Sequence, residues 1–212
     1  MKRILIIDDH VVVRQGLIQL LSLILEPAVA FDEASTGQEG IDKFNENDYC
    51  LALVDISLPG RNGLDVLREM RQLKPKIPIL VLSMHPDEQY AVRALRAGAM
   101  GYVAKASASE DLKGAIEKAL RGKKYVTPFQ ATLLADAVSE DHDIDGLQNH
   151  LSDREYQFAC MLASGKTMTQ IALELNLSVK TISTYRTRVL EKLHISTNAE
   201  IISYCITHGM VM

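Results

Sequence analysis

Carboxylate, hydroxyl and ammonium side chains stand where short apolar runs of the chain end. Asp8 and Asp9 follow the first run directly, and Asp55 ends another. Ser83 and Lys105 stand at the ends of two later runs. If the runs are parallel strands of one doubly wound sheet, their carboxyl ends lie side by side and the five side chains converge. A lone aspartate pair would indicate only a solvated turn or a helix cap, but five such groups at one edge indicate a site.

This convergence favours phosphoryl transfer assisted by a hard cation. Bare carboxylates at close range repel one another and raise their own pKa values, and a cation cancels the repulsion. Mg²⁺ takes few protein oxygens, several waters and a phosphate in octahedral geometry. A hydroxyl donor and a lysine at the same edge would receive an incoming phosphoryl group. We therefore expect a phosphoacceptor site with Mg²⁺ as its cofactor.

The elements that must position these side chains alternate along residues 1–122. Apolar runs separated by segments of helical periodicity are typical of a parallel sheet covered by helices on both faces. The sequence therefore predicts an α/β domain of the flavodoxin-like, doubly wound type with a five-stranded parallel sheet. The expected strands are 4–7, 29–34 (the weakest run), 51–54, 79–82 and 102–104, and the expected helices lie near 11–25, 38–46, 64–73, 87–97 and 109–121.

The pattern changes after Gly122. Residues 123–146 are expected to form a linker with one helix, beginning at Thr127-Pro128, and an acidic segment over 139–146. Residues 147–212 carry no strand pattern, and their helix starts predict an all-α domain of four helices. Three starts carry a capping box and the fourth a serine cap, namely Ser152 with Glu155, Thr167 with Gln170, Thr197 with Glu200, and Ser178.

The composition excludes several classes of protein. Apolar residues make up 47% and charged residues 24% of the 212 residues, which is ordinary for a globular chain and argues against disorder. No stretch reaches the roughly 18 apolar residues of a membrane helix, and residues 1–9 do not form a secretory signal. The three cysteines, Cys50, Cys160 and Cys205, have neither disulfide nor zinc-ligand spacing. We expect a soluble, cytoplasmic protein.

One helix, over 178–194, has a surface suited to DNA, although a net charge of −4 alone would discourage this hypothesis. On a helical wheel its polar side chains gather opposite an apolar stripe. Short hydroxyl side chains edged by cations suit a helix that enters the major groove, and a solvated amphipathic helix is the alternative. The stripe is Val179, Ile182, Val189, Leu190 and Leu193, and the expected DNA-contacting residues are Lys180, Thr181, Ser183, Thr184, Thr187, Arg188 and Lys192.

Arg186 falls on the apolar side of the same wheel. An unpaired cation at that place would be costly. We therefore expect Arg186 to pair within its domain, with Glu155 as the partner, and not to contact DNA.

Four segments resemble the receiver domain of two-component response regulators. They read IIDDH at 6–10, LVDISLPGRNGLDVL at 53–67, LVLS at 80–83 and GYVAK at 101–105. The last 62 residues, 151–212, resemble the LuxR-type helix-turn-helix, so nearly the whole chain is similar to the NarL/FixJ family. The resemblance implies a transcription regulator that a sensor histidine kinase phosphorylates. It also implies binding to double-stranded DNA and a homodimer in the phosphorylated or DNA-bound form.

The resemblance implies roles for individual residues as well. The last helix, near 198–208, would be a dimerisation element, and the side chains of Ser57 and His85 would influence how water reaches the phosphoryl group. The site roles are phosphoacceptor for Asp55; Mg²⁺ ligands for Asp8, Asp9, Asp55 and the backbone carbonyl of Ser57; phosphoryl-binding groups for Ser83 and Lys105; and a rotating aromatic switch for Tyr102.

A second hypothesis is a phosphohydrolase or phosphotransferase that uses Asp55 in turnover. Haloacid-dehalogenase-like enzymes also use an aspartate nucleophile with Mg²⁺, but they typically need a second aspartate two residues later. This chain has Ser57 at that position. A third hypothesis, a degenerate receiver that never takes phosphate, is disfavoured because all five pocket residues are present. We expect a regulator and not an enzyme.

Overall fold

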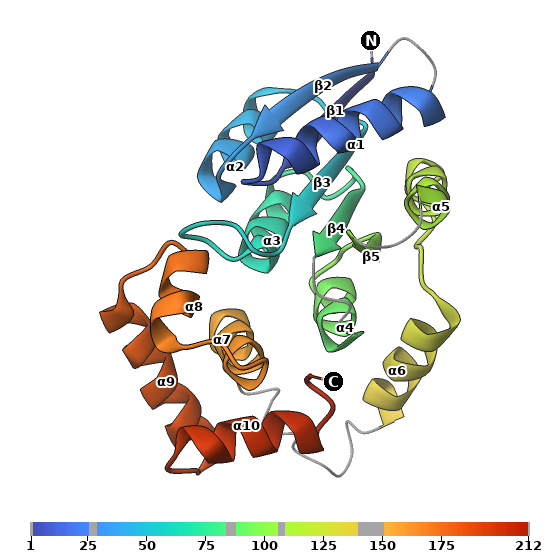
Figure 1. Cartoon of the computed structure of the whole chain (residues 1–212). Helices are drawn as coiled ribbons and strands as arrows, with labels where there is room; N and C mark the ends of the chain where they lie inside the picture. The colour runs from blue at the N-terminus through green and yellow to red at the C-terminus, as the bar shows by residue number, and fades with distance from the viewer. Residues whose placement is uncertain (1, 26–28, 84–87, 106–108, 140–150, 212) are drawn as a thin grey trace. The chain divides into compact units, whose positions relative to one another are not determined.

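The structure of the chain, a computed structural model, describes residues 2–25, 29–83, 88–105, 109–139 and 151–211 (Figure 1). By its internal contacts the chain divides into two compact units, Met1–Leu134 and Ala135–Met212. Each unit is described by itself. Within the described residues, no helix is long and apolar enough to cross a membrane.

The first unit contains a five-stranded parallel sheet, which confirms the predicted doubly wound α/β fold. The strand order is β2-β1-β3-β4-β5. The strands are β1 (Lys2–Ile7), β2 (Val29–Ala34), β3 (Leu51–Asp55), β4 (Ile79–Ser83) and β5 (Gly101–Ala104), and the helices are α1 (Val11–Ile24), α2 (Gly37–Glu46), α3 (Gly63–Leu73), α4 (Glu88–Arg96) and α5 (Ser109–Leu120). A further helix, α6 (Pro128–Ser139), begins in this unit and extends past its last residue, Leu134.

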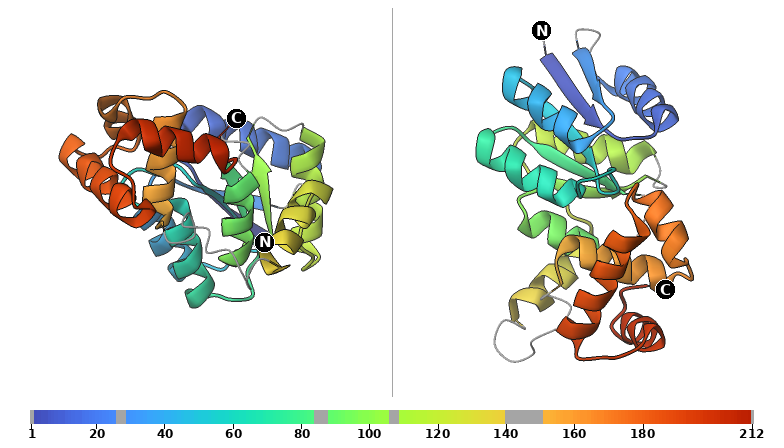
Figure 2. Two further views of the ribbon diagram at one scale, coloured as in Figure 1. Left: turned by 90° about the horizontal axis from the view of Figure 1, so that it is seen from below. Right: turned by 90° about the vertical axis from the view of Figure 1, so that its left-hand side faces the viewer.

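Helices cover both faces of this sheet, as the two views of Figure 2 show. Alternate side chains of the central strands, such as Ile4 and Ile6, form one core with Leu21 of α1 and Ile116 of α5. The other face packs against α2 and α3, where the backbone of Gly40 in α2 lies against the Ile7 side chain. β3 and β4 are buried along their whole lengths, whereas the edge strand β2 is mostly half-buried. This edge position explains why β2 has the weakest apolar pattern.

The strand order reverses direction at β1, which lies between β2 and β3. In open sheets of this kind, ligands bind outside the carboxyl ends of the strands at such a switch point. The loop after β3 makes a tight turn at this switch point. The N–H of Gly63 donates to the carbonyl of Ile56 at 2.9 Å, and the Asn62 side chain caps α3 by accepting from the N–H of Leu64. This turn fixes the backbone that follows Asp55.

Gly63→Ala is expected to lower the free energy of unfolding by about 1–3 kcal/mol, the usual cost of overpacking. An added Cβ would lie 1.9 Å from the carbonyl oxygen of Asp55, so the backbone at the end of β3 would have to shift. Gly16→Ala in α1 is the matched control, because a Cβ there meets nothing within 4 Å. The free energy of unfolding of Gly16→Ala should rise by about 0.5–1 kcal/mol. Equal free energies of unfolding for the two variants in urea titrations would contradict the packing described.

The segment after α5 still belongs to the first unit. The N–H of Tyr125 donates to the carbonyl of Met100 at 2.7 Å, and Tyr125 forms a bridge with Gly101 of β5. The boundary between the two compact units therefore falls inside α6, whereas the sequence placed the end of the first domain at residue 122. The predicted domain ranges 1–122, 123–146 and 147–212 stay a prediction. Most of the acidic segment, 140–146, lies outside the described residues.

The second unit contains α7 (Asp153–Ala163), α8 (Met168–Glu174), α9 (Val179–Leu193) and α10 (Asn198–Thr207), as the sequence predicted. All three predicted capping boxes form, and the Ser178 side chain caps α9 by accepting from the N–H of Thr181. α7 packs against α9 and α10, and α8 leads into α9 through a short turn (Figure 1). This is the arrangement of a helix-turn-helix domain.

Candidate functional site

The carboxyl ends of β1, β3 and β5 bring three of the predicted residues into direct contact. The Lys105 ammonium lies 2.6 Å from Oδ2 of Asp8 and 2.9 Å from Oδ2 of Asp55. All three side chains are almost completely buried. The lysine therefore lies between the two carboxylates and partly neutralises both.

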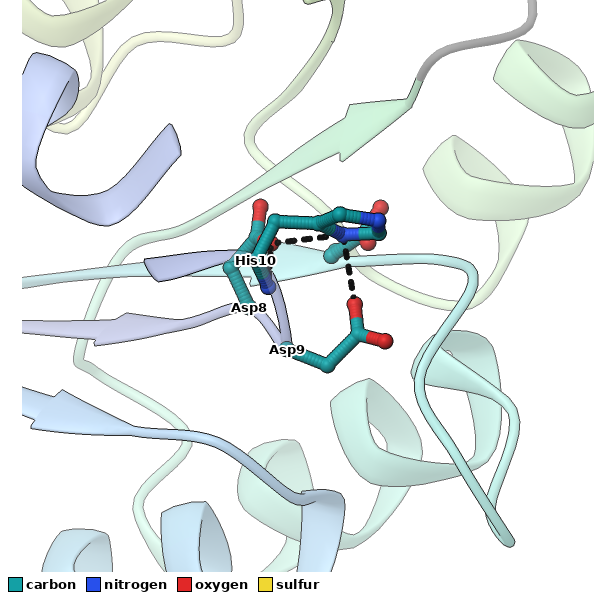
Figure 3. A group of neighbouring side chains, drawn as sticks. Asp8, Asp9 and His10 are labelled. Carbon is teal, nitrogen blue, oxygen red and sulfur yellow. Dashed lines mark hydrogen bonds and ion pairs between the residues drawn. The ribbon is translucent and has the colours of Figure 1, made fainter. Parts of the chain in front are cut away.

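Asp9 and His10 lie beside Asp8 in the turn after β1, as Figure 3 shows. Nδ1 of His10 lies 2.8 Å from Oδ1 of Asp9 and 3.4 Å from Oδ1 of Asp8. The His10 side chain is 62% exposed. One ligand atom each from Asp8, Asp9, His10 and Asp55 lies within 4.8 Å of the others.

Arg14 holds the turn after β1 in place and was not predicted as a site residue. Its Nη1 donates to the carbonyl oxygen of Asp8 at 2.7 Å, and its Nε donates to Oε2 of Glu33 at 2.7 Å. Arg14 lies on the buried face of α1 together with Leu17 and Leu21. The sequence did carry a signal for this role. Arg14 precedes Leu17 by three residues and Leu21 by seven, so it shares their face of the helix, and a cation on a buried face needs a partner inside the protein.

Burial and the neighbouring charges act in opposite directions on the pKa of Lys105. They also do so in part for Asp55, which together with Asp8 and Asp9 forms the acidic group. Burial raises the pKa of Asp55 above its usual range, and the negative charge of Asp8 adds to this, whereas Lys105 opposes it. Burial alone would lower the pKa of Lys105, but the charges of Asp55 and Asp8 outweigh burial and raise it. The lysine therefore stays protonated beside a carboxylate whose negative charge burial disfavours.

The residues present fit a divalent cation. Within the described residues, Oδ1 of the buried Asp55 accepts no well-formed hydrogen bond. With Asp8, Asp9 and Asp55 ionised and Lys105 protonated, the group carries a formal charge of about −2 that a divalent cation would balance. Carboxylate oxygens are also the donors that Mg²⁺ prefers.

The remaining predicted residues lie in β4, in β5 and in the loop after β3. Ser83 ends β4 and is buried, and its carbonyl accepts from the N–H of Lys105 at 2.6 Å. Ser57 follows β3 in the loop before α3, and Tyr102 of β5 is buried beside Val81. His85 lies outside the described residues. The structure thus places Ser57 after the carboxyl end of β3, Ser83 at that of β4 and Tyr102 within β5, while their individual roles stay predictions.

The predicted polar face of α9 is open to solvent. Lys180, Ser183, Thr184, Thr187 and Arg188 are exposed, and Thr181 and Lys192 are half-buried. Opposite them the predicted stripe is buried at Ile182, Val189 and Leu193 and partly buried at Leu190. Val179 is the exception: it was expected in the stripe but is 46% exposed, because it begins the helix before the neighbouring helices cover it.

The predicted pairing of Arg186 with Glu155 is wrong. Nε of Arg186 donates to Oδ1 of Asn198 at 2.5 Å. Glu155 pairs instead with Lys192, whose Nζ lies 2.7 Å from its Oε2. The same Oε2 accepts from the N–H of Ser152 in the capping box of α7. Lys192 was expected at a DNA phosphate, and the structure places it against a buried carboxylate.

Comparisons with known families match both parts of the chain. The profile of the response regulator receiver domain matches residues 4–117. The profile of bacterial regulatory proteins of the luxR family matches residues 149–205. The two matches fall on the α/β unit and on the helical unit, respectively.

Individual proteins match over nearly the whole length. The response regulator GacA of Pseudomonas aeruginosa is 32% identical over 211 residues, covering 100% of this chain and 98% of that protein. The response regulator UvrY of Escherichia coli is 31% identical, covering 99% and 96%. Among solved structures, RcsB of Salmonella enterica serovar Typhimurium bound to promoter rprA with the phosphomimetic BeF₃⁻ matches with a TM-score of 0.61 at 25% identity, covering 96% of this chain and 98% of that one.

Proposed function

The chain belongs to the response regulators that join a receiver domain to a LuxR-type DNA-binding domain, and on that premise we propose how its residues perform the regulation. The family consists of phosphorylation-dependent transcription regulators and not of enzymes that turn over a substrate. We assign Asp55 as the acceptor of a phosphoryl group from a sensor histidine kinase. The observation that carries this is the buried contact of Lys105 with both Asp8 and Asp55.

In the transfer, an oxygen of Asp55 forms a bond to phosphorus while the phosphorus–nitrogen bond of a phosphohistidine breaks. Mg²⁺, held by Asp8, Asp9, Asp55 and the carbonyl of Ser57, would supply positive charge for the oxygens of the transferring group. Lys105 already faces Asp55 and would neutralise the product. The phosphoryl group brings about −1.5 to −2 charges at pH 7.

That added charge would be transmitted through Ser83. Its hydroxyl, at the end of β4, would bind the phosphoryl group. A shift of this residue would change the packing of β5, where Tyr102 is buried, and of α4 beside it. We assign Tyr102 as the aromatic switch of this surface.

The DNA-binding half acts through α9, which would enter the major groove. The short side chains of Ser183, Thr184 and Thr187 would meet base edges, and Lys180 and Arg188 would meet phosphates, with Thr181 at the edge of this surface. A homodimer formed through α10 would present two such helices to double-stranded DNA. We place the regulator in the cytoplasm, where the chromosome is accessible.

Light scattering of the whole chain with and without beryllofluoride and Mg²⁺ tests the proposed assembly. We expect a larger molar mass with beryllofluoride, because the occupied pocket would favour the dimer. Asp55→Asn should not respond. An unchanged mass of the unsubstituted chain, at concentrations up to the solubility limit, would contradict dimerisation on activation.

Arg188→Gln is expected to reduce the salt dependence of binding to a random duplex by about 0.9 in the slope of log K against log salt, since one phosphate contact is lost. Arg68→Gln is the matched control, because Arg68 lies in α3 of the other unit and pairs with Asp65 on the protein surface. Fluorescence anisotropy titrations at several salt concentrations measure both slopes. Equal slopes for Arg188→Gln and the unsubstituted chain would place Arg188 away from phosphates.

A further inference from the structure

Two hydroxyl groups on the exposed face of α9, those of Thr184 and Thr187, are directed toward the helix itself. Oγ1 of Thr184 donates to the carbonyl oxygen of Lys180 at 3.1 Å, and Oγ1 of Thr187 donates to that of Ser183, also at 3.1 Å. Each bond uses the only hydrogen of that hydroxyl. Both side chains are exposed, so they offer a DNA duplex a methyl group and oxygen lone pairs, but no hydrogen-bond donor.

A third methyl-bearing side chain lies at the start of the same helix. Val179 is the first residue of α9 and is 46% exposed. It precedes Ser183 by one helical turn and therefore borders the hydroxyl face. The N-terminal residues of a recognition helix are the ones that reach base edges in the groove. Val179 thus belongs to the surface that would face DNA and not to the core.

The edges of the base pairs in the major groove make such groups selective. An A·T pair presents the thymine C5-methyl group, whereas a G·C pair presents the N7 and O6 acceptors of guanine and the N4 donor of cytosine, but no methyl group. A threonine whose hydroxyl hydrogen is already used can pack its methyl group on that of thymine. A G·C pair offers no methyl group for this contact.

We propose that α9 selects A·T base pairs in its half-site through the methyl groups of Val179, Thr184 and Thr187, and not through hydroxyl donation by the two threonines. This rests on the proposed function, because it requires α9 to lie in the major groove. The exposed cations of the same face, Lys180 and Arg188, supply affinity at the phosphates without selecting a base.

Replacement of thymine by uracil tests the methyl contacts directly, because uracil lacks only the C5-methyl group. The whole chain, activated with beryllofluoride and Mg²⁺, first selects its preferred sequence from a pool of random duplexes. Each thymine of that sequence is then replaced in turn. We expect about a fourfold loss of affinity at each contacted thymine, the effect of one buried methyl-sized group. A preferred sequence without A·T pairs at the positions facing α9, or one indifferent to every uracil, overturns the proposal.

Two substitutions of Thr184 separate its methyl group from its hydroxyl. Thr184→Val keeps a methyl and removes the hydroxyl, and it should retain both affinity and the uracil effect. Thr184→Ser keeps the hydroxyl, and it should lose about fourfold in affinity and no longer respond to uracil at the matched position. Thr132→Val is the control, because Thr132 of α6 makes the same bond, to the carbonyl of Pro128, outside the helix-turn-helix domain. Selective binding that survives in Thr184→Ser but not in Thr184→Val would show that the hydroxyl reads the base.

Failure of the proposed function would look different from failure of this inference. If the activated chain enriches no sequence from the pool, DNA recognition by α9 itself is wrong, and the inference falls with it. If a sequence is enriched and bound selectively but no methyl group matters, only the mode of reading is wrong.

Discussion

Asp55→Asn is expected to abolish phosphoryl incorporation by the whole chain. Asp55 is the one pocket aspartate that the described structure places at the end of β3, beside Lys105 and against the tight turn at Gly63. An amide is not a nucleophile toward phosphorus, so no acyl phosphate would form. Intact-mass measurement after incubation with a small phosphodonor and Mg²⁺ should show one added phosphoryl group in the unsubstituted chain and none in the variant.

Asp65→Asn is the matched control for this experiment. Asp65 lies in the first turn of α3, and its half-exposed carboxylate pairs with Arg68 on the protein surface. This variant should be phosphorylated at the same rate as the unsubstituted chain. Full incorporation in Asp55→Asn would place the phosphoacceptor elsewhere and refute the assignment of the pocket.

Lys192→Met is expected to destabilise the helical unit by about 3 kcal/mol. The substitution leaves the carboxylate of Glu155, only 2% exposed, without its cation, and breaking a buried pair from one side costs about 3–5 kcal/mol. We take the lower end of that range because the Lys192 side chain is 39% exposed and solvent already screens part of the interaction. Urea unfolding followed by circular dichroism of the helices measures the difference.

Glu155→Gln should lower the free energy of unfolding by less, about 1 kcal/mol. Glutamine can keep the capping bond to Ser152, and the Lys192 ammonium can be solvated by water. The double variant should be more stable than Lys192→Met alone, since it contains no unpaired buried charge. Additive losses in this cycle would show that the contact between Glu155 and Lys192 contributes nothing.

The loss in Lys192→Met should shrink in acid. Burial would raise the pKa of Glu155, but Lys192 and the hydrogen bonds of Ser152 outweigh it and hold the pKa below its usual 4.5. The stabilisation is therefore fully present above about pH 4.5 and disappears as the pH falls through the lower pKa of the folded state. A difference between the two proteins that stays constant from neutral pH into this acid range would contradict the pairing.

Most of the fold could be predicted because each buried strand is a short, continuous apolar run. β3 and β4 are buried on both faces and gave the clearest pattern, whereas β2 was weak because it lies at the edge of the sheet. The pocket followed from the same pattern, since a parallel sheet brings the carboxyl ends of its strands together. Arg14 could not be assigned in this way, because its partners, the Asp8 carbonyl and Glu33, depend on how α1 packs.

The errors in the helical unit have one physical origin. A helical wheel gives the direction of a side chain but not which neighbouring helix lies there. Arg186 falls on the apolar side of α9 and Lys192 beside its polar face, and only the packing of α7 decides that Glu155 meets Lys192. In the same way, the helical wheel assigned Val179 to the core, because a wheel does not show which turns of a helix are packed against its neighbours.

The most direct test of the whole account compares DNA binding by the full chain with and without beryllofluoride and Mg²⁺, in parallel with Asp55→Asn. Anisotropy titrations on a selected duplex and on a random duplex report affinity and selectivity together. We predict that beryllofluoride changes the affinity of the unsubstituted chain for the selected duplex and leaves Asp55→Asn unaffected. Identical binding curves for the unsubstituted chain in both conditions would contradict control of DNA binding by the Asp55 pocket.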